Sequence, residues 1–310
     1  MFQVERYQNV NKTEWDNFIK SSKNGLFLFY RDYMDYHSER FVDHSLIIYK
    51  KGKIAALFPA NEVGSEIQSH GGLTFGGLIM NLDVKADEVL QIFEKFLAYY
   101  KSIRFTTIIY KAIPQIFHSY LAQEDLYALF RSNALLFRRD ISSVVALDSP
   151  IKFSESKKQS VTKCKNKDLV INESNSFQEY WQLLTRVLEK FNVKPVHSLQ
   201  EIELLKTRFP SQIRLFEARL DGELLAGIVI YEFDKVVHTQ YMANSELGRN
   251  MGALDFINHE LINNKYTDRN YFSFGISTTN NGQVLNTGLI QQKEMMGARA
   301  VTIDFYRINL

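Results

Sequence analysis

Cysteine is almost absent from this sequence: Cys164 is the single one among 310 residues. One thiol cannot form a disulfide within the chain, and no Cys/His cluster is present to hold zinc, so no metal site is expected. An excess of one charge is also missing, because 37 Lys and Arg residues face 35 Asp and Glu residues. A protein that covers a large nucleic-acid surface normally has a clear basic excess. The composition therefore excludes the disulfide-rich class and gives no support to extensive nucleic-acid binding.

Long hydrophobic runs are missing as well. No stretch approaches the ~20 apolar residues of a membrane span, and the amino-terminal residues lack the apolar core of a signal peptide. We therefore expect a soluble, cytoplasmic protein with no transmembrane segment, and substrates or partners at a membrane surface remain open. Hydrophobic residues make up 45% and charged residues 23% of the chain, which is an ordinary globular composition. The length corresponds to two domains at roughly 150 residues per domain.

The two halves of the sequence repeat the same order of elements. Each half contains a predicted hairpin, in which a turn with a glycine (Gly52 or Gly222) separates two apolar segments. A third strand, an amphipathic helix and a further strand follow in both halves. The predicted elements are residues 45–49, 54–59, 67–71, 87–101 and 105–110 in the first half, and 214–220, 224–231, 236–242, 253–264 and 271–274 in the second. This repetition favours two similar α/β domains over a chance succession of common units.

A lysine-rich segment, residues 151–167, connects the halves and carries six Lys against one Glu. Two interpretations remain open: a solvated connector or helix surface, or a stripe that attracts a phosphorylated substrate into a cleft between the domains. Amphipathic helices are predicted after it, at residues 177–191 and 198–209, and Ser198 begins a capping box in the second. We place the boundary near residue 150, which gives domains of residues 1–150 and 151–310.

The strongest signal for a site lies where the strand 236–242 leads into the next helix. Residues 246–253 form a short loop in which Gly248 and Gly252 let the backbone approach a ligand, and Arg249 adds positive charge. Exposed N–H groups at the start of a helix can hold an anion. The loop therefore suits a pyrophosphate, although a strand-to-helix turn can also carry glycines for structural reasons alone.

This loop resembles the acyl-CoA-binding loop of the GNAT acyltransferase superfamily. In that family an Arg or Gln, two further residues and a Gly open the helix after the fourth strand, as Arg249 and Gly252 do here. The next small residue, Ala253, stands one place earlier than is usual in the family. The resemblance implies acetyl-CoA or another acyl-CoA as co-substrate, and no metal. The residues implied to bind it are Gln240, Met242, Gly248, Arg249, Asn250, Met251, Gly252 and Ala253.

The carboxyl-terminal part is similar to the FemABX-type peptidyl- and acyltransferases. The matching residues are Gly288, Leu289, Lys293 and Gly297, which follow a strand motif at residues 271–276. Gln292 and Met296 stand where that group has aromatic residues. The resemblance implies an α/β (α+β) fold with two tandem GNAT-like domains, each a mixed, mostly antiparallel sheet flanked by helices. It also implies an active cleft between the two domains.

A second unusual stretch is residues 69–77, which has four glycines within seven residues. Such a backbone-rich wall can approach a sugar or a peptide closely, and it is similar to a glycine loop in the first domain of the FemABX group. A tight turn without a ligand is the alternative. Because residues 79–82 lack Arg and Gly, we expect the second domain to bind the acyl donor and the first to frame the acceptor. The predicted substrate-binding residues are His37, Arg40, His70, Gly71, Gly72, Phe75, Tyr110, Lys111 and Tyr271.

Acyl transfer to an amine needs a donor for the oxyanion and a proton for the leaving group. In GNAT enzymes a backbone N–H of the fourth strand faces the thioester, which points here to Gln240, Tyr241 and Met242. Tyr241 is the predicted acid, and Tyr271 is the second candidate. His238 alternates with Gln240 on one strand face and is the predicted proton acceptor, with a buried structural histidine as the alternative. Lys293 is predicted either to stabilise negative charge or to bind an acceptor phosphate.

Three functions remain open on this basis. The first is an acyl-CoA-dependent N-acyltransferase, such as an acetyltransferase, acting on the amine of a small-molecule, sugar-nucleotide or peptidoglycan-type acceptor in cell-envelope or polysaccharide biosynthesis. The second is a FemABX-type peptidyltransferase that uses aminoacyl-tRNA. The balanced charge and the lack of a long charged helical hairpin stand against it. The third is a non-catalytic GNAT-like protein that binds a glycan or a protein.

Overall fold

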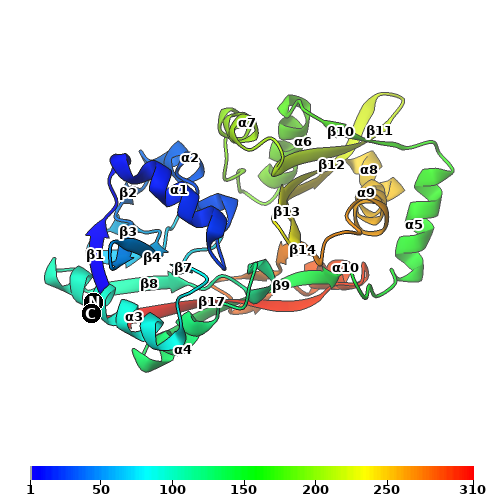
Figure 1. Cartoon of the computed structure of the whole chain (residues 1–310). Helices are drawn as coiled ribbons and strands as arrows, with labels where there is room; N and C mark the ends of the chain where they lie inside the picture. Colours follow the sequence, from blue (N-terminus) through cyan, green and yellow to red (C-terminus); the bar gives the residue numbers. More distant parts are fainter. Residues whose placement is uncertain (1) are drawn as a thin grey trace. The chain divides into compact units, whose positions relative to one another are not determined.

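The computed structural model describes residues 2–310, which divide into two compact units (Figure 1). The first unit comprises the chain up to Asp140 together with Asn280–Gln283 and Thr302–Leu310. The second unit comprises Ile141–Thr279 and Val284–Val301. The end of the chain thus packs in the first unit, although the division by sequence assigns it to the domain of residues 151–310.

The first unit contains eight complete strands and four α-helices in its described part. The strands are β1 (Phe2–Arg6), β2 (Val42–Asp43), β3 (Leu46–Lys50), β4 (Lys53–Phe58), β5 (Asn61–Val63), β6 (Glu66–Gln68), β7 (Ile79–Met80) and β8 (Thr107–Lys111). The helices are α1 (Lys12–Ser21), α2 (Arg31–Met34), α3 (Ala86–Ser102) and α4 (Glu124–Arg131), with 3-10 turns η1 (Asn9–Asn11), η2 (Phe27–Phe29), η3 (Asp35–His37) and η4 (Gln115–Phe117). Two long strands, β9 (Leu135–Ala146) and β17 (Arg299–Asn309), each have residues in both units.

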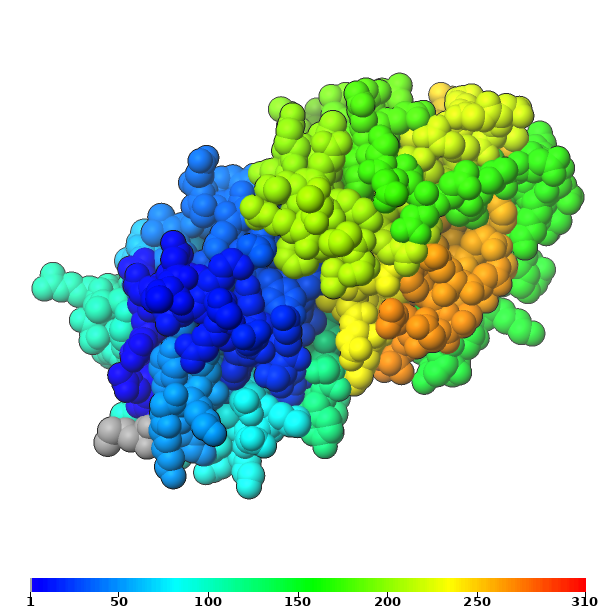
Figure 2. Space-filling model, turned by 45° about the horizontal axis from the view of Figure 1, so that its top comes forward, coloured from blue at the N-terminus to red at the C-terminus, as the bar shows by residue number. Residues whose placement is uncertain are grey.

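Two sheets build the first unit. One has the antiparallel order β1-β3-β4-β7, and in the other β8 lies between β17 and β6, with β5 and β2 beyond β6. The helix predicted at residues 87–101 is α3, and its apolar face lies in the core because Val89, Phe93, Phe96 and Tyr100 recur every three to four residues. In Figure 2 the amino-terminal segment that contains α1 is visible in dark blue at the surface of this unit.

The predicted hairpin of the first half is confirmed, but the third strand is not the one expected. β3 and β4 pair around Gly52, whose φ is 75°. The strand next to β4 is β7, whereas β6 pairs with β5 and, in parallel, with β8. β6 ends at Gln68 because His70, with a φ of 58°, turns the chain out of the extended conformation. The repeat of the two halves is therefore looser than the sequence indicates.

The second unit contains one main sheet with helices on both faces. Its strands are β10 (Val170–Ser174), β11 (Ile213–Leu220), β12 (Glu223–Glu232), β13 (Val236–Asn244) and β14 (Tyr271–Ile276), with the short pair β15 (Thr278–Thr279) and β16 (Val284–Leu285). Its helices are α5 (Glu155–Lys165), α6 (Gln178–Glu189), α7 (Leu199–Arg208), α8 (Glu246–Met251), α9 (Ala253–Glu260), the π-helical turn η5 (Leu261–Lys265) and α10 (Thr287–Glu294). α7, in yellow-green, lies at the surface of this unit (Figure 2).

The main sheet of the second unit has the order β10-β11-β12-β13-β14-β9, and only β13 and β14 pair in parallel. Side chains of Ala226 and Ile228 join the core with α9, whereas Gly227 between them faces Tyr180 of α6. Because neighbouring strand residues point to opposite faces, α6 and α9 cover opposite faces of the sheet. The capping box predicted at Ser198 is present at the start of α7.

The lysine-rich segment forms the helix α5, which packs against α9. Lys157 pairs with Asp255 at 2.6 Å, and Lys165 pairs with Glu260 at 3.4 Å. Lys163 donates to the carbonyl oxygen of Asn250 at 2.8 Å. These lysines bind groups of their own unit, so the structure favours the helix-surface interpretation over an anion-attracting stripe.

No helix within residues 2–310 combines the length and the apolar character that crossing a membrane requires. The same residues contain no group of three or more His, Cys, Asp or Glu side chains placed to hold a metal ion.

Candidate functional site

The central feature of the second unit is the place where its two parallel strands separate. β13 and β14 pair through Val236 with Tyr271, Val237 with Phe272 and His238 with Ser273, and their register ends there. β14 then shifts register against β9, and Gly275 adopts a φ of 71°. β13 continues to Asn244 along β12. Within residues 2–310, the edge of β13 that faces β14 therefore has no strand partner beyond His238, and an unpaired strand edge is where backbone groups can meet another molecule.

A β-bulge lies in this part of β13. Tyr241 pairs with Val229 and Thr239 pairs with Ile230, so Gln240 is an extra residue that has no paired residue on β12. Without the bulge, His238 and Tyr241 would point to opposite faces, because they are three residues apart. Val237 and Met242 both pack against the core on the α9 side, so their neighbours His238 and Tyr241 share the other face. The predicted pairing of His238 with Gln240 on one face is thus corrected to His238 with Tyr241.

Tyr241 is held by a histidine that the sequence analysis did not select. The hydroxyl of Tyr241 lies 2.6 Å from His197 Nδ1, and the ring of Trp181 meets the Tyr241 ring edge-on at 5.3 Å. Burial raises the pKa of Tyr241 to about 12, so the hydroxyl stays protonated at neutral pH. His197 precedes the capping box of α7, 44 residues before Tyr241, and no local spacing in the sequence indicates this contact.

His238 is buried beside Ser273. Its Nδ1 lies 3.1 Å from Ser273 Oγ on the neighbouring strand. Burial, and then the charge of Lys293, lower the pKa of His238 to about 4. The imidazole is therefore neutral at pH 7 and can accept or donate a hydrogen bond, but it holds no charge.

Lys293 of α10 is also buried, with 3% of its surface exposed. Its Nζ donates to the carbonyl oxygens of Gly275 and Ile276 at 2.9 and 2.8 Å and to Ser277 Oγ at 2.9 Å. An ammonium group has three donors, and these three acceptors use all of them. Burial lowers the pKa of Lys293 to about 8. The lysine thus fixes the turn after β14, and a direct contact with a substrate stays a prediction.

The predicted donor loop has a different local structure from the one expected. Residues 246–251 form the short helix α8, which Ser245 caps by accepting from the N–H of Gly248 at 3.0 Å. The N–H groups of Arg249 and Gly252 donate to carbonyl oxygens of this turn. A Cβ on Gly248 would overlap the carbonyl oxygen of Leu225, and a Cβ on Gly252 would lie 2.6 Å from Ser160 Cβ. Both glycines therefore give room to the chain itself rather than to a ligand.

The remaining residues of this predicted set fall into two groups. Met251 and Ala253 are buried in the core, and Arg249 and Asn250 are exposed. Sγ of Cys164 donates to the carbonyl oxygen of Met251 at 3.2 Å, which ties α5 to the end of α8. These contacts form a closed helical turn and not an open, glycine-lined loop for a pyrophosphate. Binding of a CoA at this place stays a prediction.

In the first unit the structure brings most of the predicted acceptor residues together. His37 stacks on His70 with ring centroids 5.3 Å apart, and His37 Nε2 lies 3.3 Å from the carbonyl oxygen of Gly72. Lys111 Nζ donates to the carbonyl oxygens of His70 at 3.0 Å and Leu73 at 2.7 Å. Burial lowers the pKa of His70 well below its ordinary value and the pKa of Lys111 to about 8.

Other members of the predicted acceptor set lie elsewhere or serve the core. The hydroxyl of Tyr110 donates to Asp125 at 2.6 Å, and Phe75 packs on Phe117. The guanidinium of Arg40 lies 5.8 Å from the Tyr36 ring centroid. Tyr271 belongs to the second unit.

The glycines of residues 69–77 are explained by close packing of the chain. A Cβ on Gly71 would lie 2.5 Å from Gln68 Oε1, and a Cβ on Gly72 would overlap the His37 ring. Gly77, with a φ of 87°, faces the Tyr110 ring. These contacts favour the tight-turn interpretation as the reason for the glycines.

The comparisons with known proteins agree with the fold. The sequence matches no protein-family model and no curated protein. The structure is similar to FemX, with a TM-score of 0.70 at 10% identity over 97% of this chain and 96% of FemX. It is also similar to the carboxyl-terminal domain of a putative lysylphosphatidylglycerol synthetase from Agrobacterium fabrum, with a TM-score of 0.64 at 13% identity over 98% and 93% of the two chains. A tandem GNAT protein from the clavulanic acid biosynthesis pathway gives 0.52 at 9% identity over 100% and 98%.

The predicted fold class is confirmed by these similarities. The chain is a mixed α/β protein with mostly antiparallel sheets, and it has the GNAT-type fold that FemX and the tandem GNAT protein share along their length. At identities of about one residue in ten, these similarities show the fold alone. The substrate has to be inferred from the residues of the site.

Proposed function

We propose that the protein transfers an activated acyl group to an amine, and that the reaction takes place at the partner-free edge of β13 in the second unit. The observation that carries this proposal is the bulge at Gln240, which lies two residues after the last pair of β13 with β14 at His238. A rigid strand edge places backbone N–H groups where an acyl carbonyl can lie against them. Donors fixed in this way stabilise the oxyanion of acyl transfer without reorganising.

The side chains around the edge suit the proton transfers of the same reaction. A neutral amine attacks the acyl carbon, loses a proton, and the leaving thiolate or alkoxide gains one. The neutral imidazole of His238 accepts a hydrogen bond from the amine, and Tyr241 supplies a proton-bearing hydroxyl. Lys293 acts as a positioning residue, because it fixes the carbonyl groups of Gly275 and Ile276 next to His238.

For the donor we propose an acyl-CoA, with aminoacyl-tRNA as the second candidate. GNAT-type neighbours support the first, and the similarity to FemX supports the second. The closed positions of Gly248 and Gly252 favour the second candidate, because a pyrophosphate cannot approach a backbone that Leu225 and Ser160 already contact. A net charge of +2 favours the first, since a tRNA surface calls for a larger basic excess.

For the acceptor we propose the amine of an anionic cell-envelope or polysaccharide precursor, bound by the first unit. Lys111 lies there beside His70, and its Nζ donates to the carbonyl oxygens of His70, Gly71 and Leu73. The ammonium group of Lys111 gives the glycine-rich stretch a positive potential, which attracts carboxylate or phosphate groups.

The test removes one backbone N–H of the β13 edge. Gln240→Pro deletes this donor, and a bulge is a position where a strand accepts proline. We expect the specificity constant kcat/KM to fall about a hundredfold or more, with an unchanged circular dichroism spectrum. Gln240→Ala is the matched control, because it removes the same side chain and keeps the N–H, and it should stay near the wild type.

Activity is measured with acetyl-CoA and with aminoacyl-tRNA as donors, each with an amino-sugar nucleotide as acceptor. Turnover with one donor and none with the other decides the donor class. A folded Gln240→Pro protein with wild-type turnover on the active donor would remove the basis for placing the reaction at this edge.

A further inference from the structure

Exposed apolar side chains concentrate in one short stretch of the first unit. Phe130 is 74% exposed, Leu121 68% and Leu135 60%, and the surface that we name the α4 surface consists of these residues together with Tyr120, Tyr127 and Leu136. Monomeric proteins rarely expose so many large apolar side chains in one short stretch of chain, and exposed apolar patches mark interaction surfaces. The inner side of α4 is apolar because Ala128 and Leu129 are buried in the core. Its outer side is apolar as well, because Tyr127 and Phe130 are exposed there.

The geometry of α4 brings four of these side chains, Tyr127, Phe130, Leu135 and Leu136, to one end of the helix, and Tyr120 and Leu121 precede its first turn. Tyr127, Phe130 and Arg131 are three and four residues apart on the helix and share its outer face. After the helix, the N–H of Ala134 donates to the carbonyl oxygen of Leu129 at 3.0 Å, which folds the chain back against the helix end. Leu135 and Leu136 therefore follow directly beside this end of α4.

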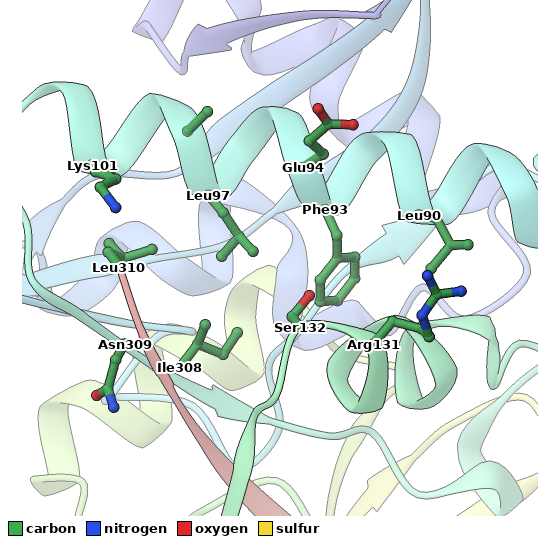
Figure 3. A pocket seen from close by; sticks show the side chains of 11 residues that line it. Leu90, Phe93, Glu94, Leu97, Lys101, Arg131, Ser132, Ile308, Asn309 and Leu310 are labelled. Atoms are coloured by element: carbon green, nitrogen blue, oxygen red, sulfur yellow. The ribbon is translucent and has the colours of Figure 1, made fainter.

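An apolar groove of about 410 Å³ meets the α4 surface at Arg131 (Figure 3). Leu90, Phe93 and Leu97 of α3 line it from one side, and the end of β17 lines it from the other. Lys101 and Arg131 stand at its border, with Glu94 as the acidic residue among the lining side chains. An apolar chain of a few carbon atoms fits between these walls.

The cations at this surface have no acidic partner. Within residues 2–310, neither Lys101 nor Arg131 forms an ion pair, and the guanidinium of Arg131 instead lies 3.4 Å from the hydroxyl of Tyr127. Glu124, which begins α4, is already paired with Lys23 at 2.6 Å. Exposed aromatic and leucine side chains next to unpaired cations have the chemistry of a surface that rests on an anionic bilayer, with rings at the headgroup level and cations at the phosphates.

We propose that the α4 surface and the adjoining groove dock the protein on a membrane that contains anionic phospholipid. The side chains of Leu121 and Phe130 enter the boundary of the acyl chains, and Lys101 and Arg131 contact lipid phosphates. This inference does not depend on the proposed acyl transfer, because it concerns a different surface and is measured without any reaction.

The test is co-sedimentation of the whole protein with vesicles. Vesicles of phosphatidylcholine mixed with phosphatidylglycerol should bind the protein, and vesicles of phosphatidylcholine alone should bind it much less. Each basic residue near an anionic surface contributes roughly a fivefold increase in affinity, so Lys101→Gln with Arg131→Gln should weaken binding about twenty-five-fold. High salt should weaken the binding of the wild type in the same direction.

Leu121→Ser with Phe130→Ser should abolish sedimentation with either kind of vesicle. The matched control is Phe191→Ser with Val196→Ser in the second unit, where the two side chains are 72% and 69% exposed. This control should bind vesicles as the wild type does.

Three results would overturn the proposal: no binding of the wild type to mixed vesicles, an equal loss in the control variant, or a concentration-dependent dimer that Leu121→Ser with Phe130→Ser dissolves. The last result would mean that a second copy of the chain covers this surface. Thermal unfolding of each variant must match the wild type, since all substituted side chains are exposed.

Discussion

One lysine in each unit fixes the conformation of a loop next to the predicted site residues. Lys111 and Lys293 each direct Nζ into a loop and donate to backbone carbonyl oxygens, those of His70 and Leu73 in one case and of Gly275 and Ile276 in the other. Each lies beside a buried histidine whose pKa is lowered first by burial and further by the charge of the lysine. A lysine whose N–H donors are all bonded to acceptors of its loop fixes the shape of that loop and adds a positive charge there. It has no donor left for a direct hydrogen bond to a substrate.

The titration of His238 tests this view at the residue scale. Its pKa is about 4 in the folded protein, against an ordinary value near 6.5 in the unfolded chain. Between these two pKa values the unfolded chain binds more protons at this position than the folded protein does. The free energy of unfolding therefore increases as the pH rises through this range and decreases as the pH falls. We expect the stability advantage of the wild type over His238→Gln to shrink by about 3 kcal/mol from neutral pH to pH ~4.

Urea unfolding at a series of pH values measures this difference. Thr239→Val, which changes the buried neighbour of His238 and removes no titratable group, is the control and should keep the pH dependence of the wild type. Parallel pH profiles for the wild type and His238→Gln would show that His238 is not held neutral by its surroundings.

At the scale of elements, the contact of α5 with the junction of α8 and α9 decides how Gly252 is understood. Gly252 has a φ of 83°, and a Cβ there would lie 2.6 Å from Ser160 Cβ. We expect Gly252→Ala to lower the free energy of unfolding by about 1–3 kcal/mol, because the added methyl group both strains the backbone and pushes α5 away. Denaturant unfolding without any ligand measures the loss.

Ser160→Gly provides the matched rescue for this variant. It opens the space that the new methyl group needs, at a cost of about 0.5–1 kcal/mol for a glycine within a helix. The double variant should therefore lose less than the sum of the two single variants. Strict additivity would mean that α5 does not press on Gly252, and that the glycine is free to serve a ligand as the sequence suggested.

Some of these elements could be predicted from the sequence, and others could not. The hairpins at Gly52 and Gly222, the helix α3 and the capping box of α7 follow from local periodicity and turn residues, and they are present. The glycines of both predicted loops were interpreted as openings for a ligand, whereas other backbone and side-chain atoms of the same chain fill the space beside them. The bulge at Gln240 and the contact of His197 with Tyr241 depend on pairing between distant segments, which no local pattern encodes.

At the scale of the whole molecule, the last strand belongs to the unit in which the chain begins. β17 pairs with β8, with Ile308 opposite Ile108, and Ile308 is 1% exposed within the core of the first unit. A substitution near the end of the chain should therefore weaken elements that lie two hundred residues earlier. This relation distinguishes the division seen in the structure from a division at residue 150.

We expect Ile308→Ala to lower the free energy of unfolding by about 2–5 kcal/mol, because it leaves a cavity in a closely packed core. Hydrogen exchange measured by mass spectrometry should show faster exchange in β8 and α3, with β11 and β12 protected as in the wild type. Ile257→Ala, at a fully buried position of α9, is the matched control and should give the reverse pattern. If Ile308→Ala instead loosened β11 and β12 and left α3 protected, the last strand would belong to the second unit in solution, and the division into units described here would be wrong.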